Sequence, residues 1–391
     1  MRTLLWLIFI IPVTAIQAQS YKKLHHKAVV VDTHNDVLST ATLNGLDIGG
    51  NLNGKAHSDL NRFKKGGVDI QMFSVFCDEQ YGAGTAFAYA NREIDSLQAI
   101  ILRNPDRMIT VNTPQELNHA LKLKKLGCMI GVEGGHMIED RLNYLDSLYR
   151  RGTRYMTLTW NNSTTWATSA KDETENIIPG LKKGLTEFGK KVVARMNELG
   201  MMVDLSHVGE QTFWDVMAVT RKPVLVSHSN AYALCPHRRN LKDDQIRAIG
   251  KNGGVIHVNF YSGFTDSTYE TKKAAFHARH QAEKDSLHLL KWPGYQIDEW
   301  LSEKYKAEAD AIRPPLSALI DHIDYIVQLI GPNHVGLGSD FDGIESSPQQ
   351  LDGVQDFPEI TKALRERGYS KKDVRKILGR NFLRLFKENS N

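Results

Sequence analysis

Histidine and carboxylate side chains follow several short apolar runs of this sequence, a placement that suits metal binding. The members of the set are His34, Asp36, Glu133, His207, His228 and Asp340. His34 and Asp36 are two residues apart, so in an extended segment both side chains point to the same side. Imidazole nitrogens and carboxylate oxygens are ligands for zinc and related divalent ions. An isolated His-X-Asp pair would more simply mark the polar end of a strand, so the metal hypothesis depends on the whole set.

The number of these ligands suits two ions, roughly 3.5–4 Å apart, that share one carboxylate and one water. Glu133 is the natural bridge because each of its two oxygens can bind one ion. A water held between two cations loses its proton near neutral pH and becomes a nucleophile. Asp340 can pass a proton to the leaving group, provided that it is not itself a ligand. We therefore expect a hydrolytic reaction, and a structural turn role for Asp342 in the same segment, SDFDG.

Two adjacent arginines, Arg238 and Arg239, lie in the segment CPHRRN at 235–240. A guanidinium group can bind a carboxylate through two parallel hydrogen bonds, so the pair suggests a substrate with a free carboxylate. Arginines on a loop are as often simply solvated, and these residues alone leave both interpretations open.

The elements that would position these residues are short apolar runs separated, for the most part, by segments with the helical period. Eight runs are found, at 29–31, 68–75, 128–132, 155–160, 201–205, 223–226, 254–260 and 334–337. This alternation predicts parallel strands with crossover helices, and eight strands predict a closed (β/α)8 TIM-type barrel. The chemical residues would then meet at the mouth formed by the carboxyl ends of the strands. A doubly wound open sheet is the structural alternative.

The stretch 265–315, between the seventh and eighth runs, is long and charged, with only scattered apolar residues. It predicts a helical insertion on the strand-end face, acting as a lid or an oligomer contact and lacking a core of its own. Its histidines, His277, His280 and His288, are expected on a solvated face. Residues 19–391 would otherwise form one domain.

Residues 1–18 are typical of a signal peptide, with Arg2 at the start, an apolar stretch at 4–16 and a small residue, Ala18, before the expected cleavage site. We therefore expect export to a periplasmic or secreted location. No second apolar run reaches about 18 residues, so no membrane span is expected in the mature chain.

The net charge of +4 and the absence of basic runs with interleaved aromatic residues give no indication of nucleic-acid binding. The three cysteines form no CxxC pair, allow at most one disulfide and do not suggest a metal site.

The motifs together resemble those of the membrane (renal) dipeptidases, which are zinc peptidases with an amidohydrolase-like barrel. The resemblance covers nearly all of the expected mature chain, through THND, GVEGGH, YMTLTWN, VDLSHV, PVLVSHSNAYALCPHRRN, GGVIHVNFY and VGLGSDFDG. It implies a dipeptide substrate, tolerance of a D-residue at its C-terminal position, and a homodimer.

The resemblance also implies a role for each matching residue. His34 and Asp36 would bind the first zinc, and His207 with His228 would bind the second. Glu133 and a water or hydroxide would bridge the two ions. Three further residues would act on the substrate: Arg239 as the partner of its terminal carboxylate, Asp340 as the acid/base, and Tyr261 as a pocket residue.

One residue departs from the family pattern in a way that bears on catalysis. Trp160 in LTWN replaces a histidine that contacts the substrate near the reacting carbonyl in the family. An indole donates one hydrogen bond but cannot accept one or exchange a proton near neutral pH. The rate or the substrate range is therefore expected to differ, with Trp160 still a substrate-binding candidate. Asn162 stands where mammalian relatives have a cysteine, so no disulfide is expected there.

Two other functions compete with the dipeptidase hypothesis. A lactonase or phosphotriesterase on the same barrel would more often need a modified bridging lysine, and the fourth run has no lysine at its end. A binding protein that kept the fold but lost turnover is the alternative from another class, and Trp160 is its motivation.

Overall fold

The computed structural model describes residues 20–82, 84–177, 182–292 and 294–391. The expected signal peptide, residues 1–18, lies outside the described residues.

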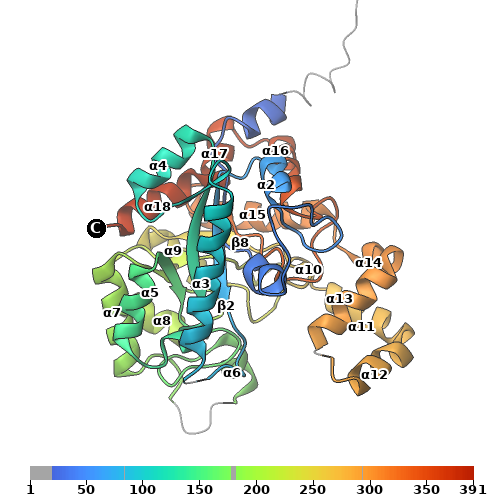
Figure 1. Ribbon diagram of the computed structural model, residues 1–391, viewed down its shortest axis with the longest axis horizontal. Helices are drawn as coiled ribbons and strands as arrows, with labels where there is room; N and C mark the ends of the chain where they lie inside the picture. Colours follow the sequence, from blue (N-terminus) through green and yellow to red (C-terminus); the bar gives the residue numbers. More distant parts are fainter. Residues whose placement is uncertain (1–19, 83, 178–181, 293) are drawn as a thin grey trace, which may run out of the picture.

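Parallel strands form a barrel around a central axis (Figure 1). In spatial order they are β1 (Val31–Asp32), β2 (Ile70–Phe76), β4 (Leu126–Glu133), β5 (Thr153–Thr157), β6 (Met202–Asp204), β7 (Leu225–Val226), β8 (Val255–Val258) and β9 (Val335–Leu337). The backbone N–H of Thr33 donates to the carbonyl of Leu337 (3.1 Å), and Asn35 pairs with Phe341 in a parallel bridge. These contacts join the last strand to the first. The predicted TIM-type barrel is therefore confirmed, and the open-sheet alternative is wrong.

One strand, β3 (Met108–Thr110), was not predicted. It pairs with Leu126–Cys128 at the start of β4, whereas β5 pairs with the later residues Ile130–Glu133. Since β2 occupies the other side of β4, β3 lies on the same side as β5, below the mouth of the barrel.

Helices connect the strands, and several begin or end as their sequences indicate. The connecting helices are α2 (Leu60–Gly66), α3 (Ala86–Arg103), α4 (Pro114–Leu123), α5 (Leu142–Arg150), α6 (Ala170–Glu175), α7 (Glu187–Leu199), α8 (Glu210–Val219), α9 (Asp243–Asn252), α10 (Ser262–Thr265) and α15 (Leu316–Ile330). At the start of α4, Thr113 and Glu116 form a reciprocal capping box, with Pro114 as the first residue of the helix. At the end of α7, Gly200 takes the left-handed conformation (φ 80°) that favours glycine.

The C-terminal segment closes the end of the barrel where the strands begin, opposite the mouth. It contains α16 (Phe357–Glu366), α17 (Lys371–Arg375) and α18 (Asn381–Asn389), with the short helices η3 (Val354–Asp356) and η4 (Lys376–Arg380). Two further short helices, η1 (Leu38–Thr42) and η2 (Gly135–Ile138), follow β1 and β4. Phe382, Leu385 and Phe386 of α18 pack in one apolar cluster with inward-facing strand residues such as Ile70 and Met202. A larger cluster fills the layer between the strands and the surrounding helices. The interior is therefore a packed core, and the mouth at the opposite end carries the polar residues.

The insertion between β8 and β9 consists of α11 (Tyr269–Arg279), α12 (Gln281–Leu289), α13 (Gly294–Lys304) and α14 (Lys306–Ile312). Figure 1 shows these helices as a group beside the barrel rather than around it. The prediction that they lack a core was wrong, because four apolar side chains form a small buried cluster of their own: Phe276, Leu287, Ile297 and Leu301. Their sequence spacing is too irregular to reveal one face.

Two of the three histidines of the insertion are also less solvated than predicted. His277 is buried, with Nε2 3.4 Å from Asp298 Oδ1, and His280 stacks on the ring of Tyr305 (centroids 3.6 Å apart). His288 is exposed, as predicted.

Cys77, Cys128 and Cys235 are buried and unpaired. Among the described residues, no helix is both long and apolar enough to cross a membrane.

Candidate active site and metal centre

The six histidine and carboxylate residues predicted as a set converge at the mouth of the barrel. His34 and Asp36 follow β1, Glu133 ends β4, and the remaining members, His207, His228 and Asp340, follow β6, β7 and β9. His34 is fully buried, and Asp36, Glu133, His207 and His228 are at most 8% exposed. Because parallel strands of a barrel carry their carboxyl ends to one face, residues far apart in the sequence meet here.

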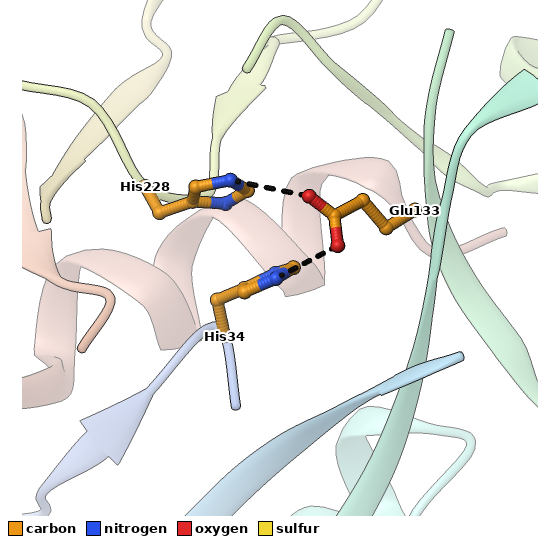
Figure 2. A group of neighbouring side chains, drawn as sticks. All are labelled: His34, Glu133 and His228. Carbon is orange, nitrogen blue, oxygen red and sulfur yellow. Dashed lines mark ion pairs between the residues drawn. The ribbon is translucent and has the colours of Figure 1, made fainter. Parts of the chain in front are cut away.

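Glu133 lies between His34 on one side and His207 with His228 on the other. Its Oε2 is 3.3 Å from Nε2 of His34, whereas its Oε1 is 2.8 Å from Nε2 of His207 and 3.5 Å from Nε2 of His228. Figure 2 shows the carboxylate with one oxygen directed at His34 and the other at His228. Each carboxylate oxygen of Glu133 therefore faces different histidines.

Two sets of three residues could each hold a metal ion, and both sets include His34. Within each set, the potential ligand atoms all lie within 4.8 Å of one another. One contains His34, Glu133 and His228, and the other contains His34, Asp36 and Asp340. Nε2 of His34 is 3.3 Å from Asp36 Oδ2 and 3.8 Å from Asp340 Oδ1. Asp36 Oδ1 is buried and has no hydrogen-bond partner among the described residues. Nitrogen and carboxylate oxygen ligands in this arrangement fit zinc or a similar divalent ion.

The orientation of His34 is fixed from below by Tyr155, which lies inside the barrel. Nδ1 of His34 is 2.8 Å from the hydroxyl of Tyr155, and that hydroxyl donates to the carbonyl of Thr33 (3.2 Å). The phenol can then only accept from His34, so Nδ1 carries a hydrogen and Nε2 faces the cluster. Gly131 makes room for this tyrosine, since a Cβ at that position would lie 2.0 Å from its ring.

A second chain of hydrogen bonds orients His228. Its Nδ1 is 2.7 Å from the hydroxyl of Ser227, which also lies 2.6 Å from Asp204 Oδ2. Asp204 is fully buried and accepts in addition from the hydroxyl of Thr157 and from the backbone N–H groups of Ser206 and Ser227. The Asp204 carboxylate thereby ties the ends of β5, β6 and β7 together beneath the candidate metal ligands.

Burial keeps His207 and His228 in the neutral form, in which an imidazole can bind a metal ion. Burial, together with the cation of Arg239, lowers the pKa of His207 to about 4. Burial and the nearby His34 hold the pKa of His228 well below its usual value. A neutral imidazole offers a lone pair, whereas a protonated one does not.

Asp340 is held in a special position beside this cluster. Its backbone is left-handed (φ 61°), as is that of His207 (φ 64°), a conformation uncommon outside glycine. The side-chain amide of Asn259 donates to Oδ2 of Asp340 (2.8 Å), which leaves Oδ1 of Asp340 facing the cluster. Burial raises the pKa of Asp340 well above its usual value. Gly343 permits the close approach, since a Cβ there would lie 2.3 Å from Asp36 Oδ2 and 2.9 Å from Asp340 Oδ1.

Arg239 is a buried cation with no ion pair to any described residue. It is 6% exposed, and its guanidinium donates to the hydroxyl of Ser229 (3.3 Å) and to the carbonyl of His228 (3.4 Å). Burial lowers its pKa to about 10. Its neighbour Arg238 is more exposed and pairs with Glu175 (3.1 Å). Buried arginines are normally paired, so Arg239 is available for an anion.

The remaining predicted residues take different positions around the mouth. Trp160 is half-buried, with its ring centroid 6.5 Å from that of His207. The hydroxyl of Tyr261 is 2.9 Å from Glu270 and 2.8 Å from Glu345, so it is engaged by carboxylates of the insertion and of the β9 loop. Asp342 accepts from the backbone N–H of His57 (2.6 Å), a structural role like the one predicted.

Sequence reasoning missed the supporting residues of the site: Tyr155, Asp204, Ser227 and Asn259. Tyr155 reads as an ordinary core aromatic inside a strand, and its contact with His34 depends on the barrel. Asp204 and Ser227 carried a usable signal, because each is a polar residue at the end of an otherwise apolar run. Asp204 lies in the motif VDLSH and Ser227 in the motif VSH.

Comparison with known proteins identifies the family and the fold of the chain. A model of the membrane dipeptidase family, peptidase family M19, matches residues 18–391. An uncharacterized dipeptidase of Schizosaccharomyces pombe is 31% identical over 388 residues, covering 95% of this chain and 82% of that protein.

Two solved structures share the fold. The probable dipeptidase PvdM from Pseudomonas aeruginosa has a TM-score of 0.77 at 24% identity, covering 96% of this chain and 98% of that one. A metallo peptidase from Rhodobacter sphaeroides, liganded with a phosphinate mimic of the dipeptide L-Ala-D-Ala, has a TM-score of 0.75 at 24% identity, covering 93% and 99%. The resemblance predicted from the motifs is confirmed by the family match, which spans nearly the whole chain: the protein belongs to the membrane dipeptidase family.

Proposed function

We propose that this dipeptidase-family member binds two zinc ions at the mouth of its barrel and hydrolyses the peptide bond of dipeptides. His34 and Asp36 would hold the first ion, and His207 and His228 the second, with Glu133 as the bridge. The observation that carries the proposal is the division of the Glu133 carboxylate, with Oε2 3.3 Å from His34 and Oε1 2.8 Å from His207. A carboxylate that served one ion alone would not need its oxygens directed at two groups.

Zinc ions held by these residues would supply an acidified water and polarise the carbonyl of the substrate. The residues of the chain supply the remaining chemistry. Oδ1 of Asp340, left free by the bond from Asn259 to Oδ2, takes a proton from the attacking water and delivers it to the leaving nitrogen. Its raised pKa supports this role, because a carboxyl group that is readily protonated can act as an acid near neutral pH.

The substrate class follows from Arg239. A buried, unpaired guanidinium beside the ligand cluster would bind the terminal carboxylate of the substrate and leave room for only two residues between them. We further propose that a D-residue is tolerated at the C-terminal position. The Rhodobacter sphaeroides relative was solved with a mimic of L-Ala-D-Ala, which supports the proposal by similarity.

The decisive experiment combines metal analysis of the purified protein with a panel of L-L and L-D dipeptides. Two equivalents of zinc and cleavage of dipeptides, but not of a matched tripeptide, are expected. Glu133→Gln should abolish loading of the ion pair. A variant that keeps two metals and full activity would remove the bridging assignment, and efficient tripeptide cleavage would contradict a pocket closed by Arg239. A metal-loaded protein without activity on the whole panel would favour the binding-protein alternative.

We also propose that the protein is exported through residues 1–18 and forms a homodimer. N-terminal sequencing of the protein from its native host should begin at Gln19, and light scattering should give twice the mass of the mature chain. An intact N-terminus or a monomeric mass would contradict the respective proposal.

A further inference from the structure

Two aromatic side chains at the mouth have no part in the chemistry proposed above. Phe76 is the last residue of β2, and Trp160 follows β5. Their ring centroids are 4.9 Å apart with an interplanar angle of 57°, and both side chains are half-buried. They therefore form one apolar surface that is partly open at the mouth.

This pair lies directly beside the proposed ligands. The ring of Trp160 is 6.5 Å, between centroids, from that of His207. Gly134, the residue after Glu133, is a neighbour of Trp160, since a Cβ built on Gly134 would be in ordinary van der Waals contact with Trp160 Cβ (3.5 Å). A substrate whose scissile bond reached Glu133 and His207 would therefore have the aromatic surface within contact distance.

The strand order places Phe76 across the mouth from Arg239. In the ring of eight strands, β2 is four strands from β7 in either direction, and Arg239 is held at the end of β7 by Ser229 and the carbonyl of His228. A dipeptide with its carboxylate on Arg239 would extend its amino-terminal residue toward the opposite wall, where Phe76 lies with the ring of Trp160 packed against it. Polar groups, Asn259 and Asp340, occupy the ends of β8 and β9 instead.

We propose that Phe76 and Trp160 form the contact surface for the side chain of the amino-terminal residue, and that the enzyme favours dipeptides whose first residue is large and apolar or aromatic. Aromatic rings that are already partly desolvated gain contact area when an apolar side chain covers them. The inference rests on the proposed dipeptidase function, because the position of the scissile bond sets the direction of the substrate.

The test is the selectivity of the zinc-loaded enzyme among Phe-Ala, Ala-Phe and Ala-Ala. The wild type should cleave Phe-Ala with a kcat/KM roughly tenfold or more above that for Ala-Ala. Ala-Phe should gain much less. In Trp160→Leu and in Phe76→Leu, the ratio of Phe-Ala to Ala-Ala should fall toward one. Trp214→Leu, which replaces a half-buried tryptophan of α8, should keep the wild-type ratio.

Zinc content and thermal unfolding of each variant, measured alongside, separate a change in selectivity from a damaged site. An unchanged ratio in correctly loaded Trp160→Leu overturns the inference while leaving the proposed function intact. A preference for Ala-Phe overturns it as well, because the aromatic surface would then contact the other residue. If the loaded wild type cleaves none of the three dipeptides, the proposed function fails and the inference fails with it.

Discussion

The hydroxyl of Tyr155 lies 2.8 Å from Nδ1 of His34 and donates its own hydrogen to the carbonyl of Thr33, so the orientation of the proposed zinc ligand depends on a residue inside the barrel. Partners of this kind fix the tautomer and the ring angle of a metal-binding histidine.

Tyr155→Phe should therefore weaken zinc binding by roughly 10–100-fold. The ring still fills the space left by Gly131, so the fold should survive. Competition with a chromophoric chelator measures the affinity, and circular dichroism checks the fold. Tyr149→Phe, on α5, removes a hydroxyl away from the cluster and is the matched control. Unchanged affinity in Tyr155→Phe would show that the tyrosine only fills volume.

Asp340→Asn should separate proton transfer from metal binding. The amide can still accept from Asn259, so the side chain should keep its place while losing the ability to exchange a proton. We expect kcat to fall by roughly 10²–10⁴-fold with two zinc ions retained. Inductively coupled plasma mass spectrometry gives the metal content. Loss of one equivalent would instead make Asp340 a ligand, as its grouping with His34 and Asp36 allows.

Arg239→Lys should lose recognition of the substrate's carboxylate, because an ammonium group cannot form the paired hydrogen bonds of a guanidinium. A charge-assisted bond of this type contributes about 1.5–3 kcal/mol, so kcat/KM should fall by roughly 10–100-fold, mainly through KM. Arg238→Lys is the control, since its side chain pairs with Glu175 and is more exposed. Dipeptide amides, which lack the terminal carboxylate, sharpen the test. They should be poor substrates of the wild type, and Arg239→Lys should lower their kcat/KM only slightly further. An equal loss with both substrates would contradict carboxylate binding.

The sequence was sufficient for the barrel because burial on both faces leaves a strong signal in parallel strands. Each of the eight barrel strands overlaps a predicted apolar run, although the boundaries differ by up to three residues, as for β5. β3 escaped because it has three residues and its last, Thr110, is exposed, so neither length nor hydrophobicity marks it. The core of the insertion escaped for a related reason: Phe276, Leu287, Ile297 and Leu301 come from three separate helices.

The candidate ligands were predictable because strand ends converge in a barrel, which converts positions in the sequence into positions in space. The supporting residues were not, because their roles depend on contacts between strands. Tyr155 reaches His34 only through the barrel interior, and Asn259 reaches Asp340 across 81 positions of sequence.

Three buried histidines outside the site should make the fold sensitive to acid: His25, His257 and His322. Burial lowers the pKa of each to about 4. His25 shows the balance: its ring is fully buried, and the cost of burying a charge outweighs the hydrogen bond to the carbonyl of Gly66 (2.7 Å), which by itself would raise the pKa. In the unfolded chain the pKa returns to about 6.5. Between these values the unfolded state binds more protons, so the stabilisation is complete above pH 6.5 and is lost as the pH falls toward 4.

Each such histidine should contribute a slope of about 1.4 kcal/mol per pH unit to the free energy of unfolding in this range. His25→Asn removes one of the three. Urea unfolding should show the wild type's advantage over His25→Asn shrinking by about 1.4 kcal/mol between pH 7.5 and 5.5. The difference between the two proteins cancels the pH dependence of metal binding, which they share. His288→Asn, at an exposed position of α12, should show a constant difference from the wild type. A gap between wild type and His25→Asn that stays constant with pH would mean that His25 accepts a proton as easily in the folded protein as in the unfolded chain.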